Sequence, residues 1–572
     1  MRERWRAGYG ARDARADVLA GLVVGIMALP LAMAFAIASG VPPQHVLYTA
    51  IFASALCALT GGSRLNVTGL TAAFVALLVP VTAKFGLGGL MCATLLAGLI
   101  LVVMGLARMG RLIQFIPYPV TTGFTAGIAV VIAVLQLRDF LGLDAAGTSA
   151  HFHERAAVLA RALPTARWPE AAVGGFTLAW VFAWPRFVRR VPAALVAVPL
   201  AAGLAWLLAR AGHGCDTIGT RFHFLDAAGE VRAGIPTTLP GFSWPWERPG
   251  PGGAPLAFDW GFLRELIGPV FAIALLGAIE SLLCAVVADG MAGTRHDPNA
   301  ELLGQGLGNI VAPFFGGIPA TGAIARTATN VRAGARSPLA SVVHALFVLG
   351  AMLSLGGLLR HVPMAALAAL LLVAAWNMSD ARHVVHVLRV APRSDKLVLA
   401  TCFGLTVLFD MVLAVSVGVV LAALLFMRRM AHLATVRLVD NGTAPHADQV
   451  PPGVVLYELG GPLFFGAAEK AFSALDRIHD DCRTVVLDLH AVPSMDVSGL
   501  VALQSGLRTL WRRDVEVVLA GARRQPRLLL RRAGLRPADG RLRFARSAES
   551  ALRVLRARAR EGAPPSFAPG SR

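Results

Sequence analysis

The sequence predicts a polytopic α-helical membrane protein of fourteen segments, arranged as two inverted repeats of seven, followed by a small cytoplasmic α/β domain. Three observations support this fold class. Long apolar runs fill residues 18–427, and the 572-residue chain has a mean hydropathy of +0.63. Two similar glycine-containing stretches lie half a chain length apart. Beyond residue 430, short strands alternate with amphipathic helices.

The apolar part divides into segments of roughly twenty residues, the length that crosses a bilayer. Residues 1–17 are expected to be a cytoplasmic N-terminal segment, and the repeats to cover about 18–210 and 262–430. An odd number of segments in each repeat makes the repeats inverted. The predicted segments are centred near Met27, Ser54, Val75, Leu99, Ala126, Trp180, Gly203, Ala278, Gly308, Thr327, Ala351, Leu370, Leu405 and Val419.

The charge pattern places both termini in the cytoplasm. The net charge is +19, but the arginines of the membrane part fall in alternate short loops, as the positive-inside rule requires. This distribution argues against a nucleic-acid partner. A charged fraction of 15% is low for a soluble enzyme, and no nucleophile–base, phosphate-loop or metal motif is visible. The six cysteines form no CxxC pair, so we expect no disulfide and no metal site.

The two similar stretches predict a ligand site. They read GGSRLNVTGLTAA at 61–73 and GGIPATGAIARTA at 316–328: a glycine pair, an extended run, Thr-Gly, then a short helix. Glycine and small residues can also serve only close helix packing. Two matching copies instead favour two half-helices whose N-termini face each other near the midplane. Unpaired N–H groups and a partial positive charge at each N-terminus suit an anion.

Two ionisable residues stand out inside apolar runs. Arg326 lies at the start of the second half-helix, and Glu280 lies deep in the run 271–284. Intramembrane charges are costly and usually functional. We expect Arg326 to bind the anion and Glu280 to carry a proton. The alternatives are that Arg326 snorkels to the cytoplasm or forms a structural salt bridge, and that Glu280 is a structural partner of Arg326 or of a backbone N–H.

These motifs resemble the SulP anion-transporter family, the sulfate-permease and prestin group. The resemblance spans nearly the whole chain and implies a substrate-carrying core, a gate, elevator-like alternating access, a homodimer and a location in a bacterial inner membrane. Within the family the chain is most similar to the bacterial aerobic C4-dicarboxylate transporters. This similarity lies in residues 276–290, in AAWNMS (374–379) and in LFDMV (408–412). The family motifs are GIMALPLAMAFA (25–36), AIESLL (278–283), GQGLGN (304–309) and PFFGG (313–317).

The resemblance also implies which residues bind substrate. They come from the first span and the two half-helices: Leu31, Phe35, Gly69, Leu70, Thr71, Ala323, Ile324, Ala325 and Arg326. Many family members have Gln at the position of Leu31, and often Ser at that of Ala325. Leu31 and Ala325 therefore lack the polar side chains that would hold an inorganic oxyanion in those family members, so such a substrate is disfavoured here.

The residue one turn after Glu280 bears on the coupling ion. Sodium-linked members of the family have a hydroxyl there, whereas this chain has Cys284. A thiol is a poor ligand for a hard cation, so a co-transported proton is favoured over sodium. No other cofactor is expected.

The C-terminal part is expected to comprise a linker (431–452), a domain (453–560) and a disordered tail (561–572). Strands are predicted at 454–459, 484–489 and 515–520, and helices at 467–478, 498–510, 525–533 and 548–558. The loop PSMDVSGL at 493–500 resembles that of STAS domains. Asp496 is expected to cap the following helix. Ser498 aligns with the serine phosphorylated in anti-sigma-factor antagonists, and is otherwise expected to be a helix N-cap.

The leading functional hypothesis is proton-coupled uptake of C4-dicarboxylates such as succinate, fumarate or aspartate. One alternative is a bicarbonate or sulfate transporter that uses sodium or exchange. A membrane sensor or scaffold that signals through the STAS domain is an alternative of another class. The expected partners are a small anion, membrane lipid, a second copy of the chain and an unidentified cytoplasmic protein that binds the STAS domain.

Overall fold

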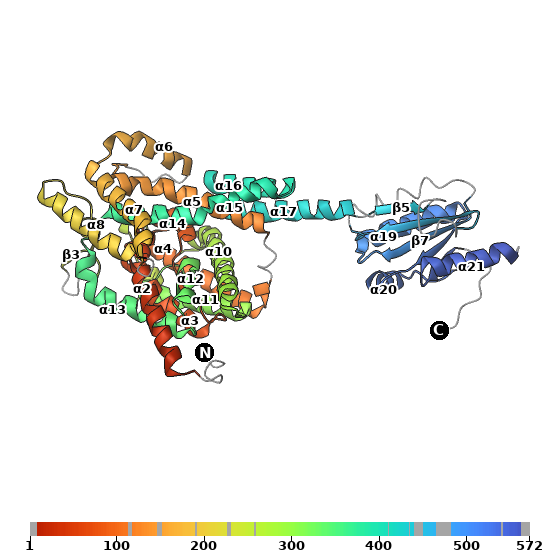
Figure 1. Cartoon of the computed structure of the whole chain (residues 1–572), viewed down its shortest axis with the longest axis horizontal. Helices are drawn as coiled ribbons and strands as arrows, with labels where there is room; N and C mark the ends of the chain where they lie inside the picture. Colours follow the sequence, from red (N-terminus) through yellow and green to blue (C-terminus); the bar gives the residue numbers. More distant parts are fainter. Residues whose placement is uncertain are drawn as a thin grey trace. The chain divides into compact units, whose positions relative to one another are not determined.

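The computed structural model describes residues 9–111, 117–145, 152–188, 192–225, 230–256, 259–409, 411–433, 435–439, 450–464, 482–538 and 541–561. It divides into two compact units, Met1–Val420 and Leu421–Arg572. The first is almost entirely helical, and the second is built on a sheet (Figure 1).

The described part of the first unit contains all fourteen predicted membrane segments, which confirms the predicted fold class. Eight of its helices are long and apolar enough to cross a membrane. One of them, α4, contains two segments, because Gly86 has a left-handed φ of 67° that breaks the helix. The segments are α2 (Ala11–Ala38), α3 (Gln44–Thr60), α4 (Ala72–Leu106), α5 (Tyr118–Leu141), α7 (Trp168–Phe187), α8 (Ala193–Arg210), α10 (Trp260–Ala292), α11 (Pro298–Val311), α12 (Ile324–Arg332), α13 (Leu339–Leu359), α14 (Met364–Ser379), α16 (Arg393–Leu408) and α17 (Met411–Leu433).

The helices pack as two groups, a core and a gate. In the core, α2 packs on α12 and α13, and its counterpart α10 packs on both segments of α4 and on α12, while α11 packs on α3 and α4. In the gate, α5 packs on α14 and α16, and α7 packs on α8 and α14. The core contacts occur in matching pairs, as expected of two repeats with opposite orientations.

The two glycine-containing stretches meet inside the core. Each contributes a two-residue strand, β1 (Thr68–Gly69) and β4 (Thr321–Gly322). The strands pair antiparallel, with Thr68 opposite Gly322 and Gly69 opposite Thr321. The helices α4 and α12 begin two or three residues later, so the predicted change from extended chain to half-helix is confirmed in both copies.

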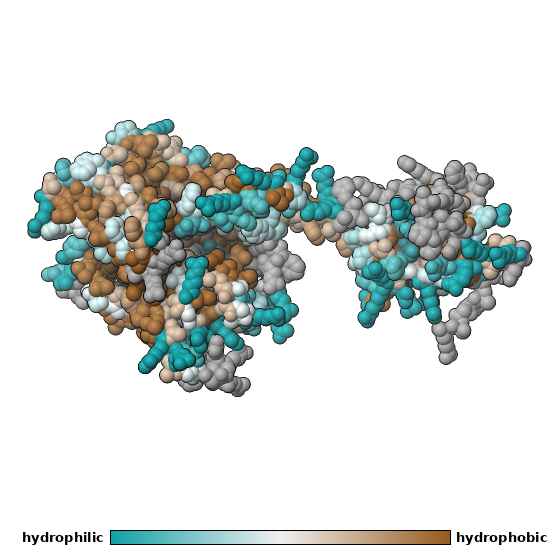
Figure 2. Space-filling model, viewed as in Figure 1, coloured by the Kyte–Doolittle hydropathy of each residue, from teal (hydrophilic) through white to brown (hydrophobic). Residues whose placement is uncertain are grey.

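Large apolar side chains remain exposed on the first unit, as expected for a surface that faces lipid. Phe187 and Trp260 are each 80% exposed, and Figure 2 shows hydrophobic residues over much of this unit's visible surface. The smaller elements are α6 (Phe152–Ala162), η2 (Leu163–Thr165), α9 (Ile218–Arg221), β2 (His223–Leu225), β3 (Val231–Ala233), η3 (Pro245–Glu247), η4 (Pro251–Gly253), η5 (Ala312–Phe315) and α15 (Ala381–Val390).

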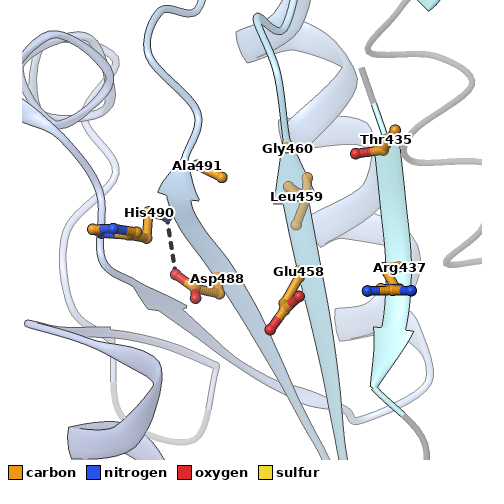
Figure 3. A pocket seen from close by; sticks show the side chains of 8 residues that line it. All are labelled: Thr435, Arg437, Glu458, Leu459, Gly460, Asp488, His490 and Ala491. Atoms are coloured by element: carbon orange, nitrogen blue, oxygen red, sulfur yellow. Dashed lines mark hydrogen bonds between the residues drawn. The ribbon is translucent and has the colours of Figure 1, made fainter. Parts of the chain in front are cut away.

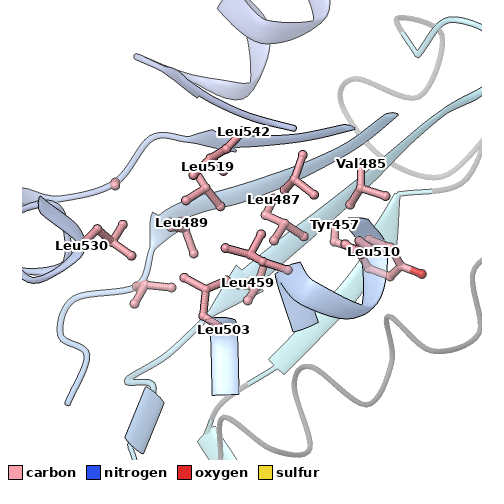
Figure 4. Close-up of a cluster of buried hydrophobic side chains, with 14 of the residues drawn as sticks. Tyr457, Leu459, Val485, Leu487, Leu489, Leu503, Leu510, Leu519, Leu530 and Leu542 are labelled. Carbon is pink, nitrogen blue, oxygen red and sulfur yellow. The ribbon is translucent and has the colours of Figure 1, made fainter. Parts of the chain in front are cut away.

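The second unit has a five-stranded sheet in the order β5-β6-β7-β8-β9. The edge strand β5 is antiparallel to β6, and the remaining strands are parallel. Residues alternate between the two faces of the sheet. Val485, Leu487 and Leu489 pack with α19 and α20 (Figure 4), whereas Val486 packs with α21 on the opposite face. The elements are β5 (Thr435–Val439), β6 (Val454–Gly460), β7 (Thr484–Ala491), α19 (Val497–Arg512), β8 (Glu516–Ala520), α20 (Arg524–Arg532), β9 (Leu542–Ala545) and α21 (Ala548–Glu561).

Three predicted boundaries differ from the structure. The first helix begins at Ala11, inside the predicted N-terminal segment. The predicted linker 431–452 overlaps the end of α17 and the strand β5, which is stabilised by pairing with the distant β6. The predictions for 467–478 and for the tail fall outside the described residues, except that Glu561 ends α21.

Candidate functional site

Buried polar side chains hold the first extended stretch in place. The Glu301 side chain on α11 is 2% exposed and accepts hydrogen bonds from the Ser63 N–H at 2.9 Å and from Asn66 Nδ2 at 2.6 Å. One turn further along α11, Gln305 Nε2 donates to Thr68 Oγ1 at 2.8 Å. Buried polar groups of the backbone and of side chains both need such partners in an apolar medium, and Glu301 and Gln305 supply them from α11.

The second extended stretch has equivalent support. Asn309 accepts a hydrogen bond from the Ala320 N–H at 2.8 Å and donates to the Ala320 carbonyl at 2.9 Å. Ser281 Oγ accepts from the Gly322 N–H at 3.0 Å and lies 2.9 Å from Thr321 Oγ1. The irregular backbone at the centre of the core is therefore fixed from α10 and α11.

Neither half-helix has a side-chain cap at its N-terminus. The N-cap residues are Thr71 for α4 and Ala323 for α12. The Thr71 hydroxyl turns away from its own helix and donates to Glu280 Oε2 at 2.6 Å. The Phe74 N–H donates to the Thr71 carbonyl at 3.2 Å, which leaves the Ala72 and Ala73 N–H groups of α4 and the first N–H groups of α12 available to a ligand. The helix dipoles favour a negative ligand there.

The Arg326 guanidinium lies at the crossing of the two strands. Arg326 is 2% exposed, and among the described residues neither Nη1 nor Nη2 has a hydrogen-bond partner. It lies directly over Gly69, where an added Cβ would come within 2.2 Å of Nη1. The alternative that Glu280 is its salt-bridge partner is wrong, because that carboxylate is bonded to Thr71 instead.

The other predicted residues of the half-helices differ in exposure. Leu70 is fully buried and Ala323 is 5% exposed, so both support the backbone. Ile324 is 43% exposed and Ala325 is also exposed, so the first turn of α12 faces open space. A ligand could reach the N-terminus of α12 from that side.

The first span approaches the same turn. Thr329 Oγ1 lies 3.7 Å from the Met27 sulfur, which joins α12 to α2. Leu31 lies one turn beyond Met27 on α2, and Ala325 lies one turn before Thr329 on α12. Leu31 is half-buried and Phe35 is 8% exposed. The role of Leu31 and Phe35 in substrate binding stays a prediction.

Cys284 belongs to the buried polar network. Its sulfur lies 2.9 Å from Asn66 Oδ1 and 3.1 Å from Thr327 Oγ1. The Cys284 thiol is therefore already hydrogen-bonded to other side chains of the core. In the part of the chain that the structure describes, no group of three or more His, Cys, Asp or Glu residues could hold a metal ion.

Several residues that build this site were not predicted from the sequence. Glu301, Gln305 and Asn309 lie in or beside the motif GQGLGN, and their polarity within an apolar run was the available signal. His344 on α13 is a further polar residue in an apolar segment. Only their packing shows that the first three support the crossing.

The structure resolves the roles of two predicted residues in the second unit. Asp496 is the N-cap of α19, and its Oδ1 accepts from the Gly499 N–H at 2.7 Å. Ser498 lies exposed in the first turn, so its interpretation as the N-cap is wrong. Phosphorylation of Ser498 stays a prediction.

A cavity of about 600 Å³ lies at one end of the sheet of the second unit (Figure 3). Arg437, Glu458 and Asp488 follow one another across β5, β6 and β7. The His490 N–H donates to Asp488 Oδ1 at 2.9 Å. Neither Asp496 nor Ser498 lines this cavity, and its mixture of charges suits a polar partner.

A helical core that holds two half-helices around a buried guanidinium defines a membrane carrier of small anions. The sequence matches the Sulfate permease family over residues 15–401 and the STAS domain over residues 447–551. The chain belongs to the sulfate permease (SulP) family. It is a multi-pass secondary anion transporter with a STAS domain, and not an enzyme.

Similar proteins cover nearly the whole chain. A putative sulfate transporter, YvdB of Bacillus subtilis, is 38% identical over 530 residues, covering 92% of this chain and 95% of the relative. The bicarbonate transporter BicA of Picosynechococcus is 29% identical, with 92% and 91% covered. The murine Solute Carrier 26 family member A9 anion transporter shares the fold, with a TM-score of 0.82 at 18% identity and with 96% and 93% covered. The transmembrane domain of a cyanobacterial BicA gives a TM-score of 0.59 at 25% identity, with 73% and 98% covered.

Proposed function

We propose that this chain takes up C4-dicarboxylates such as succinate, fumarate and aspartate together with protons. The observation that carries the proposal is the buried Arg326 guanidinium, which has no partner among the described residues and lies beside two uncapped helix N-termini. A buried charge of this kind is expensive unless something neutralises it. A carboxylate would do so through paired N–H···O bonds.

Glu280 is our candidate for the proton carrier. It is half-buried on α10 and is joined through Thr71 to the start of α4, so protonation of its carboxyl would be felt at the anion site. A neutral carboxyl can cross the membrane with the core more easily than a carboxylate. Sodium is the less favoured coupling ion, because Cys284 offers sulfur and is already bonded within the core.

The grouping of the helices into a core and a gate, which meet where α2 and α4 contact α14, α8 and α5, supports elevator-type alternating access, in which the core carries the site across the membrane. We further propose a homodimer in a bacterial inner membrane, with both termini in the cytoplasm. The arginines in alternate loops support this orientation.

A second candidate function is transport of sulfate or bicarbonate. It is favoured by the names of the relatives, which include a putative sulfate transporter and a bicarbonate transporter. The same guanidinium and helix N-termini would suit an inorganic oxyanion. Leu31 and Ala325 supply no hydrogen-bonding side chains for it, which favours the dicarboxylate.

Uptake into proteoliposomes tests these proposals. Labelled succinate, sulfate and bicarbonate would each be offered under an inward proton gradient or a sodium gradient. We expect proton-driven succinate uptake that falls at least about tenfold in Arg326→Gln, given the strength of hydrogen bonds to charged groups. The control Arg332→Gln, at the exposed end of the same helix, should match the wild type.

The outcomes separate the candidates. Uptake of sulfate or bicarbonate without succinate would overturn the substrate class. Accumulation against a gradient by Glu280→Gln as well as by the wild type would exclude the proposed proton carrier. Wild-type uptake of every anion by Arg326→Gln would overturn the site itself.

A further inference from the structure

A groove lies between helices of the core and a helix of the gate. Its walls are α2 and the end of α13 on the core side and α8 on the gate side (Figure 1), and it encloses about 480 Å³. Pockets that hold a small ligand usually enclose roughly 300–1,000 Å³, so this groove is large enough for one. Leu29 and Met33 of α2 and Val198 of α8 are its buried lining residues near the centre of the helix contact.

The lining of the groove is almost entirely apolar. Apart from Trp206 and His361, every described residue that lines it has an aliphatic or thioether side chain. Trp206 is 53% exposed and Leu358 is 68% exposed, so the groove opens onto the apolar surface that faces lipid. Packed proteins leave few voids of this size empty, because the lining atoms would lose their contacts. In a membrane, the molecules at hand to fill it carry hydrocarbon chains.

Two basic side chains stand at one end of the groove. The last residue of α8 is Arg210, whose Cζ lies 4.2 Å from the centroid of the Trp206 ring. His361, which lines the groove, follows the last turn of α13. The ends of the two helices are joined, because the Ile218 N–H donates to the Val362 carbonyl at 3.0 Å. In the described part of the chain, no acidic side chain forms an ion pair with either basic residue.

An apolar groove with a basic end matches an amphipathic anion. A hydrocarbon chain would fill the groove, and a phosphate at its end would accept charge-assisted hydrogen bonds from Arg210. An indole ring beside a cation is also typical of the membrane–water interface, where phospholipid headgroups lie. The ligand that fits both parts of the groove is therefore a phospholipid with a negative headgroup.

We propose that the groove between α2, α8 and α13 binds one acyl chain of an anionic phospholipid, with the phosphate at Arg210 and His361. The bound chain would contact helices of the core and of the gate at the same time. This inference goes beyond the proposed transport function and does not depend on which anion the protein carries.

Native mass spectrometry of the purified full-length protein tests the proposal. The protein would be released from nanodiscs that contain phosphatidylglycerol and phosphatidylcholine in equal amounts, and the retained lipids would be counted per chain. We expect Leu195→Trp to retain one phosphatidylglycerol fewer than the wild type, because the larger side chain enters the groove. Leu200→Trp on the same helix is the matched control: the two leucines are 39% and 41% exposed, but of the two only Leu195 lines the groove.

A second pair of variants tests the headgroup contact. One basic side chain near a membrane surface favours an anionic lipid by about fivefold. We therefore expect Arg210→Gln to lower the ratio of retained phosphatidylglycerol to phosphatidylcholine by about fivefold. Arg161→Gln, at an exposed arginine on α6, should leave this ratio unchanged.

The outcomes decide between the proposal and its rivals. Ala202→Phe fills the same groove from a half-buried position on α8 and would serve if Leu195→Trp does not fold. Equal retention of phosphatidylglycerol by the wild type and a folded groove variant would overturn the proposal, as would a wild type that retains both lipids equally. A wild-type dimer that dissociates in Leu195→Trp but not in Leu200→Trp would show instead that a second copy of the chain covers the groove.

Discussion

Replacing Gly69 with alanine should displace the Arg326 guanidinium without unfolding the core. The added Cβ would lie 2.2 Å from Nη1 and 3.2 Å from Cζ. Favourable contacts between heavy atoms lie at about 3.5 Å or more, so the guanidinium must withdraw by more than about 1 Å. It can do so because the clash involves the end of a flexible side chain. Gly69 also has no left-handed φ that an alanine would strain.

The size of the effect follows from the lost contacts. A hydrogen bond to a charged group contributes about 1.5–3 kcal/mol. Removing one such bond between Arg326 and the anion should therefore weaken Kd by roughly 10- to 150-fold. The melting temperature of the purified protein should stay close to that of the wild type.

The change in Kd is measured by anion binding to the purified protein. Uptake into proteoliposomes is measured in parallel. Gly350→Ala is a matched control, because an added Cβ on that residue of α13 meets nothing within 4 Å. A Gly69→Ala protein that folds and binds its anion with the wild-type Kd would refute the placement of the guanidinium at the binding site.

Three further predictions concern stability and reactivity. Glu301→Gln should lower the free energy of unfolding by about 1–3 kcal/mol, because an amide offers donors where two buried N–H groups need acceptors. Thermal unfolding in detergent measures this change. The control Glu265→Gln, at a residue that is 58% exposed and paired at the surface, should change the free energy of unfolding by less than about 1 kcal/mol. Asp496→Ala should destabilise the STAS domain by about 0.5–2 kcal/mol, measured by chemical denaturation. Ser498→Ala should leave the stability of this domain nearly unchanged. Equal effects of the two substitutions would contradict the assignment of Asp496 as the N-cap. Burial raises the pKa of the Cys215 thiol to about 11, so the thiol is protonated at neutral pH. Its maleimide labelling rate should rise about tenfold per pH unit from pH 7 to beyond pH 9. A rate that levels off near pH 8.5, the ordinary pKa of a thiol, would contradict the raised pKa.

Much of the membrane fold could be predicted because its signals are local. Apolar length located the segments, and the repeated Thr-Gly pairs located the crossing before any contact was known. The edge strand at 435–439 was missed because it is stabilised by pairing with β6, across the predicted linker. The short strand β9 was missed for the same reason, since its partner β8 lies more than twenty residues earlier in the chain.

The candidate site could be predicted only in part. Arg326 and Glu280 stood out because charge is rare in apolar runs. Whether they pair with each other could not be deduced from sequence, because it depends on where α10 and α12 meet. The support from Glu301 likewise arises from contacts between residues far apart in the chain.

The pairing of Thr68 with Gly322 and of Gly69 with Thr321 ties one short segment of each repeat to the other. Each repeat alone would supply one of the two strands and one of the two half-helices, and its strand edge would lie unpaired in a medium that cannot solvate it. The two half-helices therefore cannot slide past each other without breaking this joint. In the proposed elevator-type motion, the two strands and the two half-helices would therefore move together as one body.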